Sequence, residues 1–121
     1  MKLYHFSSIG NLKKIDVQYF GKNSFTKNDA NISTVKRAFY YAEPKPLEYL
    51  LESSTYRYTV EIDAEKIYDL TKDSKGYTVK FNNIDAILRE LQKNFDAVTY
   101  DCGFQCYNVF KPLTVKKIKK L

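Results

Sequence analysis

The chain has 121 residues, a formal net charge of +6 and two cysteines, and these numbers exclude several classes of protein. The length suits a single domain over residues 1–121, and the 44% hydrophobic and 16% aromatic content argues against disorder. No apolar run approaches the roughly 20 residues that cross a bilayer, and the first residues lack the apolar core of a signal peptide. We therefore expect a cytoplasmic protein without a membrane-spanning segment.

Basic residues gather near the end of the sequence, where residues 116–120 include four lysines. This charge favours an acidic partner, whether nucleic acid, a nucleotide or an acidic protein surface, although such lysines also simply keep a terminal strand soluble. Cys102 and Cys106 stand four residues apart beside a turn, without the further ligands that a structural zinc site requires. The sequence therefore predicts no metal site.

The first part of the chain predicts a strand followed by a long polar connection. Lys2–Ser7 alternates as a strand should, with Tyr4 and Phe6 as candidates for the core and His5 on the opposite face. The segment Gly21–Ser33 is rich in Asn, Ser, Lys and Asp, and we expect it to be a surface loop. A loop of this length can have a role in function.

The rest of the chain predicts one clear helix and further strands. Asn83 can cap a helix that begins at Ile84, and Asn94 fits the left-handed position that would close it. Short helical pieces are expected at residues 9–14 and 47–51. Strands are expected at Ala38–Ala42, Tyr56–Asp63, Ala97–Tyr100, Gln105–Phe110 and Thr114–Ile118. Together these elements predict the α+β fold class.

Several short segments are informative as an ordered set. Residues 3–7 read LYHFS, residues 38–43 AFYYAE, residues 56–62 YRYTVEI, residues 95–98 FDAV and residues 106–112 CYNVFKP. In this order they resemble the strands of ADP-ribosyltransferase domains of the diphtheria-toxin and poly-ADP-ribose-polymerase type. The resemblance covers most of the chain and is greatest to small versions from phage and mobile-element proteins, some of which disarm bacterial defence systems.

The resemblance implies a fold of split antiparallel sheets with one main helix, and NAD as a substrate. It assigns four NAD-binding positions: His5 hydrogen-bonds a ribose, the Phe6 backbone holds the nicotinamide amide, Ser7 contacts the ribose or the ring, and Tyr40 stacks on the nicotinamide. The expected activity is that of an ADP-ribosyltransferase or NAD glycohydrolase. Its expected target is a host or defence protein.

The third site residue of that family, usually a glutamate, falls at Gln105 or Cys106 in this sequence. Gln105 can bond a ribose 2′-hydroxyl but cannot act as a base at neutral pH. Asp101 is the nearest acid, although an aspartate in such a place also suits a turn. Phe6 and Ala38 stand where the family prefers glycine. The catalytic candidates are therefore Asp101 and Gln105.

Two other functions remain open at this point. Without the glutamate, the same fold could be a catalytically inactive module that binds a nucleotide or a protein. The positive charge and abundant tyrosines also suit a small basic nucleic-acid-binding protein, since bases stack on aromatic side chains. The sequence contains no RNA-binding strand motif, helix-turn-helix or zinc finger, which disfavours the nucleic-acid alternative.

Overall fold

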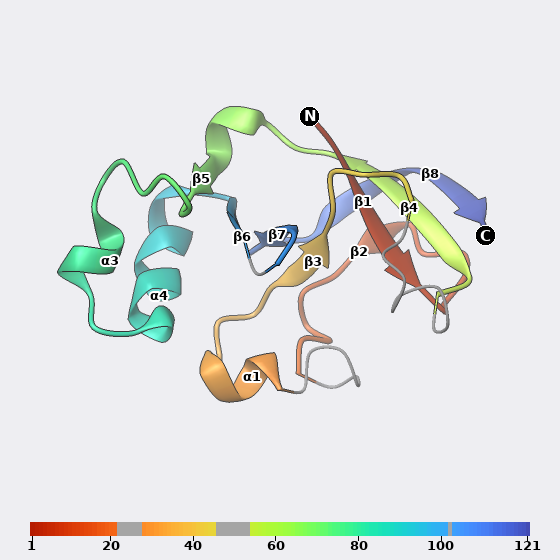
Figure 1. Cartoon of the computed structure of the whole chain (residues 1–121). Coiled ribbons are helices and arrows are strands. Elements are labelled where there is room, and N and C mark those ends of the chain that lie inside the picture. Colours follow the sequence, from red (N-terminus) through yellow and green to blue (C-terminus); the bar gives the residue numbers. More distant parts are fainter. Residues whose placement is uncertain (22–27, 46–53, 102) are drawn as a thin grey trace.

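The computed structural model describes residues 1–21, 28–45, 54–101 and 103–121, and its strands form two four-stranded sheets (Figure 1). The first sheet has the order β1-β4-β8-β2, with strands at Lys2–Ser7, Tyr56–Glu61, Leu113–Lys120 and Lys14–Ile15. The second has the order β3-β7-β6-β5, with strands at Ala38–Tyr40, Gln105–Val109, Ala97–Asp101 and Ile67–Asp69. Every pair is antiparallel except β5 with β6, which is parallel.

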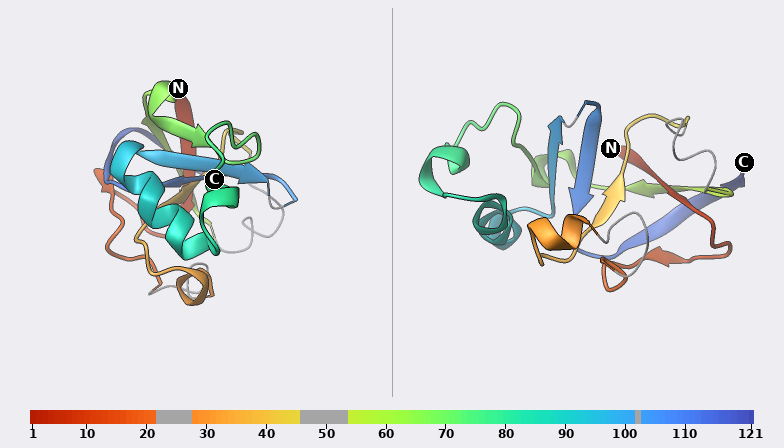
Figure 2. Two further views of the ribbon diagram at one scale, coloured as in Figure 1. Left: turned by 90° about the vertical axis from the view of Figure 1, so that its left-hand side faces the viewer. Right: turned by 60° about the horizontal axis from the view of Figure 1, so that its bottom comes forward.

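The helices are short apart from one. α4 spans Ile84–Asn94 and covers the second sheet on the side away from the first (Figures 1 and 2). The other helical elements described are α1 at Asp29–Ile32, α3 at Tyr77–Lys80 and the 3-10 turn η1 at Ala64–Lys66. This mixture of two sheets and a few helices confirms the α+β class. None of the described helices has the length and apolar character needed to span a bilayer.

The two sheets meet where β1 passes the end of β3. The Tyr4 amide donates to the Tyr41 carbonyl and the Tyr41 amide to the Tyr4 carbonyl, both at 2.8 Å. Elsewhere the strands of the two sheets run in clearly different directions (Figure 2). The main core lies between them and consists of Leu3, Ile15, Ala38, Tyr40, Tyr58, Val60, Ile62, Ala97, Tyr107, Val109 and Leu113.

Both faces of β1 are covered, and this overturns one expectation. Leu3 is fully buried in the core between the sheets, and the alternation of the strand places His5 on that same face. Phe6 is buried on the other face, where its ring lies 5.9 Å from that of Tyr41. The prediction that His5 faces away from the core is therefore wrong. A strand buried on both sides has no apolar pattern that tells the faces apart.

The start of α4 follows the prediction but its end does not. Asn83 Oδ1 accepts the Ala86 amide at 2.9 Å, which confirms the predicted cap. Asn94 is the last helical residue, and the chain continues through Phe95 in an extended conformation with φ −129°. The prediction that Asn94 is left-handed is wrong. The centres of the Phe95 and Tyr68 rings lie 5.1 Å apart, and the extended backbone that places Phe95 there continues directly into β6.

Three further expectations differ from the structure or concern residues outside the described ranges. The short helix expected at residues 9–14 is absent, because the Tyr58 hydroxyl bonds the backbone of Ile9 and Leu12 instead. The predicted loop Gly21–Ser33 contains α1, and its residues 22–27 lie outside the described residues. The helical piece expected at residues 47–51 also lies outside them.

One buried charge organises the outer face of the second sheet. Arg37 is only 5% exposed; its Nε donates to Asn108 Oδ1 at 2.8 Å and its Nη1 to the Val35 carbonyl at 2.7 Å. The guanidinium also lies 4.3 Å from the centre of the Phe20 ring, a cation–π distance. Burial lowers the pKa of Arg37 from its usual value, which still leaves it charged at neutral pH.

Candidate functional site

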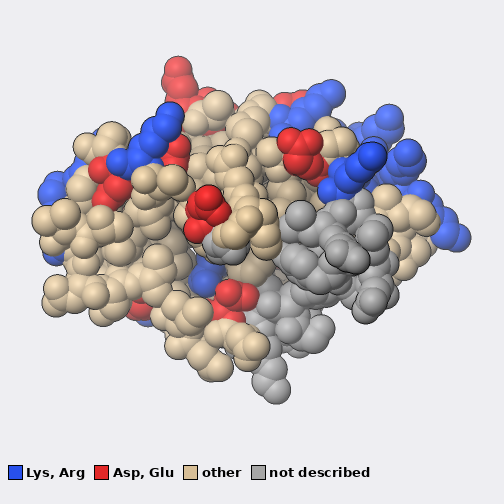
Figure 3. Space-filling view, in the orientation of Figure 1, with Lys and Arg blue, Asp and Glu red and all other residues tan. Residues whose placement is uncertain are grey.

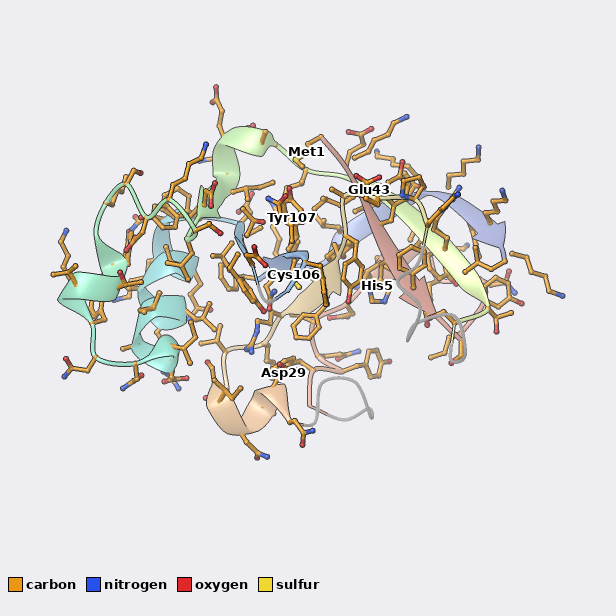
Figure 4. The ribbon with its side chains drawn as sticks, in the orientation of Figure 1. Met1, His5, Asp29, Glu43, Cys106 and Tyr107 are labelled. Carbon is orange, nitrogen blue, oxygen red and sulfur yellow. The ribbon has the colours of Figure 1, made fainter. Side chains whose placement is uncertain are left out.

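The junction of the two sheets brings together two of the residues that the sequence singled out. The rings of His5 on β1 and Tyr40 on β3 lie with their centres 5.4 Å apart and their planes tilted by 53°. These side chains are 35 positions apart in the sequence, and the Tyr4–Tyr41 bridge beside them holds the two strands together. His5 therefore points toward β3, next to the position where Cys106 and Tyr107 lie on β7 (Figure 4).

The hydrogen bond of His5 determines which of its nitrogens is available. Nδ1 lies 2.8 Å from the Phe39 carbonyl oxygen, which can only accept, so Nδ1 carries the proton. Burial lowers the pKa of His5, so the ring is neutral at neutral pH. In this neutral form Nε2 is an acceptor, and no described residue bonds to it. His5 can therefore accept a hydrogen bond from a hydroxyl group of a ligand.

Tyr40 offers a hydrogen-bond donor, whereas His5 offers an acceptor. Its side chain is fully buried, and its hydroxyl has no hydrogen-bond partner among the described residues. An unsatisfied buried hydroxyl typically costs about 1–3 kcal/mol, so a protein retains one mainly where another group completes it. Burial also raises the pKa of Tyr40 and keeps the phenol protonated. In the structure as it stands, Tyr40 lies in the core and presents no open ring face for stacking.

The backbone of Phe6 is the third feature of the junction. The carbonyls of Met1 and Ser7 accept bonds from the β4 side, whereas the amide and carbonyl of Tyr4 bond to Tyr41. Since alternate residues of a strand direct their backbone groups to opposite edges, Phe6 directs its amide and carbonyl the same way as Tyr4. Phe6 is the next residue after Tyr4 on this edge of β1, and no described residue bonds to its amide or carbonyl.

Ser7 lies at the end of β1, half-buried, on the face that also holds His5. Its Oγ accepts the amide of Ile9 at 3.1 Å, so the hydroxyl stabilises the turn that follows the strand. The hydroxyl proton is not used in that bond and can still be donated to another group.

A pocket of about 130 Å³ lies beside this junction. It is lined by residues that follow β3 and by the start of β7: Tyr41, Ala42, Glu43, Lys45, Phe104 and Gln105. The rings of Tyr41 and Phe104 lie 5.9 Å apart in its wall. Among its described lining residues, the pocket therefore combines aromatic walls with a carboxylate, an amine and an amide.

The three candidates for the third site position separate in the structure. Tyr107 and Val109 of β7 belong to the core, so the alternation of the strand places Gln105 on the same face as Tyr40 and Cys106 on the opposite face. Gln105 Nε2 lies 3.2 Å from Thr99 Oγ1, and its side chain lines the pocket.

Asp101 pairs with Gln105 across the β6–β7 hairpin. Its side chain is exposed, and its Oδ1 accepts the Gly103 amide at 2.9 Å. Gly103 has φ +100°, a conformation that glycine adopts without strain, so this bond stabilises the turn. No described contact joins Asp101 to His5 or Tyr40.

Sequence reasoning gave no role to Glu43 and Lys45, which both line the pocket. Each is an ordinary exposed charge in the sequence pattern, and only the pairing of β3 with β7 brings them opposite Phe104 and Gln105. The acidic position that ends the AFYYAE segment was the one available signal for Glu43.

Comparison of the chain with known proteins gives no match among family models, curated proteins or solved structures. Among the described residues, no group of three or more His, Cys, Asp or Glu side chains is placed to hold a metal ion.

Proposed function

We propose that this chain is an ADP-ribosyltransferase-like protein that binds NAD at the β1–β3 junction and cleaves its nicotinamide–ribose bond. The observation that carries the proposal is the convergence of His5, Tyr40 and the Phe6 backbone, which lie in separate segments of the sequence. A cytoplasmic location and an acceptor protein belonging to a phage host remain part of this proposal.

The hydrogen-bonding groups at the junction complement those of NAD. The nicotinamide carboxamide has an NH₂ group that can donate to the Phe6 carbonyl and an oxygen that can accept from the Phe6 amide. It would therefore continue along β1 the backbone pairing that Tyr41 makes with Tyr4. A ribose hydroxyl can donate to His5 Nε2 because Nδ1 already bonds Phe39. The buried Tyr40 hydroxyl is available for a further bond near the same place.

The Tyr40 ring can stack on nicotinamide only after the neighbouring side chains move. Tyr41 and Phe104 already form an aromatic wall in the pocket next to it. We therefore assign the first contact with the nicotinamide ring to this wall, and to Tyr40 the support of His5 from within the core.

Cleavage needs electrostatic support, because breaking the nicotinamide–ribose bond builds positive charge on the sugar. The electron pair of that bond leaves with nicotinamide, and water or an acceptor side chain adds to the ribose carbon with loss of a proton. Asp101 and Gln105 are the proposed polarising groups. Gln105 lines the pocket, and its amide oxygen can accept the 2′-hydroxyl. Asp101 would first have to leave the Gly103 amide.

The test is an assay of nicotinamide release from NAD. We expect His5→Gln to lower the rate by about a hundredfold, since it removes a positioned acceptor at the ribose. Tyr40→Phe removes only the hydroxyl and should lower activity with little change in folding. Tyr77→Phe is the control, because Tyr77 is also a buried tyrosine but belongs to the second hydrophobic cluster, away from the junction.

The polarising group is identified by a second set of variants in the same assay. Asp101→Asn should reduce cleavage, whereas Asp63→Asn should not, although each aspartate accepts an amide two residues later. Glu43→Gln reports whether the pocket carboxylate takes part. Full activity in both His5→Gln and Tyr40→Phe would remove the assignment.

A second function, nucleotide binding without catalysis, is favoured by the absence of a carboxylate at Gln105 and Cys106. Asp101, the nearest acid, is occupied in its own turn. Calorimetry would then detect NAD binding that His5→Gln weakens, with no release of nicotinamide. If neither binding nor cleavage of NAD occurs, both functions are wrong.

A further inference from the structure

The edge of β8 carries backbone groups that the sheet does not use. β8 pairs with β4 along most of its length, but on its other side the described residues pair only with its start: β2 pairs with Leu113 and Thr114, and the Val115 amide bonds the Lys13 carbonyl. The Leu121 amide bonds the Thr55 carbonyl of the β4 side, so the alternation of the strand turns Ile118 and Lys120 toward the free edge. All residues from Lys116 to Leu121 are exposed.

This edge is strongly basic. Its lysines, 116, 117, 119 and 120, have no carboxylate within ion-pair distance in the part of the chain that the structure describes. Arg57 pairs with Lys119 across β4 and β8, and places a further positive charge on the same face. Figure 3 shows Lys and Arg side chains gathered at the right-hand end of the molecule, where Figure 1 places the end of β8.

The two faces of the edge differ in chemistry. Lys117 and Lys119 share the face of Thr59 and Arg57, their partners on β4. Ile118 lies on the other face, which it shares with Lys120, the partner of Tyr56, and it is 41% exposed, which leaves an apolar contact area beside that lysine. A strand that paired with this edge would fit best with acidic side chains on the face of Lys117 and Lys119 and an apolar side chain against Ile118 on the other face.

We propose that the free edge of β8 docks an acidic strand of a partner protein, whose side chains alternate between carboxylate and apolar. A second copy of this chain is a poor occupant, because it would set lysines beside lysines. A nucleic acid is also a poor occupant, since its phosphates can accept from backbone amides but cannot donate to the backbone carbonyls of the edge, and single strands bind through stacking on open aromatic faces. Tyr4, on that face, is half-buried and has Arg57 over its ring at 5.4 Å.

The test measures binding of a fluorescein-labelled peptide, (Glu-Val)₄, by anisotropy at low salt with the full chain. We expect binding that weakens at least about tenfold in Lys117→Glu/Lys119→Glu, because the peptide carboxylates would then face like charges. Lys72→Glu/Lys80→Glu changes the net charge equally, at exposed residues outside the first sheet, and should change the affinity by less than about twofold.

Two further probes separate edge pairing from simple charge attraction. A peptide with N-methyl groups on alternate amides keeps its charge but cannot pair along one edge, and it should not bind. Single-stranded DNA of the same net charge should bind more weakly than the peptide. Equal binding of the methylated peptide, tighter binding of the DNA or no binding of (Glu-Val)₄ would each overturn the proposal. The NAD site is not needed for any of these outcomes.

Discussion

At the scale of single residues, His5 shows what the sequence can predict, its importance as a candidate, and what it cannot, its orientation. The sequence singles it out because it lies in a strand whose residues, LYHFS, resemble the first strand of ADP-ribosyltransferase domains. Its orientation was predicted wrongly, because alternation predicts which residues share a face but not which face meets the core when both are covered. The partner at Phe39 and the resulting tautomer depend on the approach of β3, which no local pattern contains.

The lowered pKa of His5 has a measurable effect on stability. The unfolded chain binds the proton near the usual value of 6.5, whereas the folded chain binds it only at a lower pH. The free energy of unfolding should therefore fall as the pH drops below about 6.5, by up to about 1.4 kcal/mol per pH unit until the folded pKa is reached.

His5→Gln should remove this contribution from urea unfolding curves recorded between pH 7 and pH 5. Since His5 is the single histidine of the chain, its imidazole proton signal also reports the folded pKa directly. A titration midpoint at or above 6.5 would contradict the burial of the ring.

Arg37 and Asn108 form the second residue-scale feature that can be tested. Asn108→Leu leaves the Arg37 Nε buried without its acceptor, and should lower the free energy of unfolding by about 2–3 kcal/mol. Arg37→Met in the same background should recover part of that loss, because it also removes the buried charge. Urea unfolding of both single variants and the double variant measures the coupling, and simple additivity would argue against the contact.

At the scale of elements, prediction succeeded where a local signal is strong. The Asn83 cap predicted the start of α4, and the strands expected at Lys2–Ser7, Tyr56–Asp63, Ala97–Tyr100 and Gln105–Phe110 match β1, β4, β6 and β7 within a few residues. The parallel strand β5 was missed, because it spans only Ile67–Asp69 and forms by pairing with β6. Such short strands depend on a distant neighbour rather than on their own pattern.

The cap of α4 gives the prediction at this scale. Asn83→Ala removes the acceptor for the Ala86 amide and should lower the free energy of unfolding by about 1 kcal/mol. Asn82→Ala is the matched control, since Asn82 is the exposed residue just before the cap. An equal loss in both variants, measured by urea unfolding, would show that the cap is not responsible.

At the scale of the whole molecule, the meeting of the two sheets could not be predicted from pattern alone. The order of the segments suggests split sheets through a resemblance; the structure confirms the α+β class with two sheets that meet at the Tyr4–Tyr41 bridge, and the finer fold stays a prediction. The pocket residues Glu43 and Lys45 come together with Gln105 only through this arrangement. The concentration of charge on β8 was readable from the sequence, but its place on an open edge was not.

This concentration of charge predicts a response of the whole fold to salt. The lysines of residues 116–120 lie within a Debye length of one another and repel in the folded state. Sodium chloride at high concentration should therefore raise the melting temperature by about 3 °C. Lys117→Gln/Lys119→Gln should reduce the rise, while Lys72→Gln/Lys80→Gln should not, and identical salt responses would locate the repulsion elsewhere.

The most direct test of the proposed NAD site is a crystal structure of the chain grown with excess NAD. The account predicts the nicotinamide amide bonded to the amide and carbonyl of Phe6, and a ribose hydroxyl within hydrogen-bond distance of His5 Nε2. NAD bound along the β8 edge instead, or a β1–β3 junction that stays empty while NAD binds elsewhere, would contradict it.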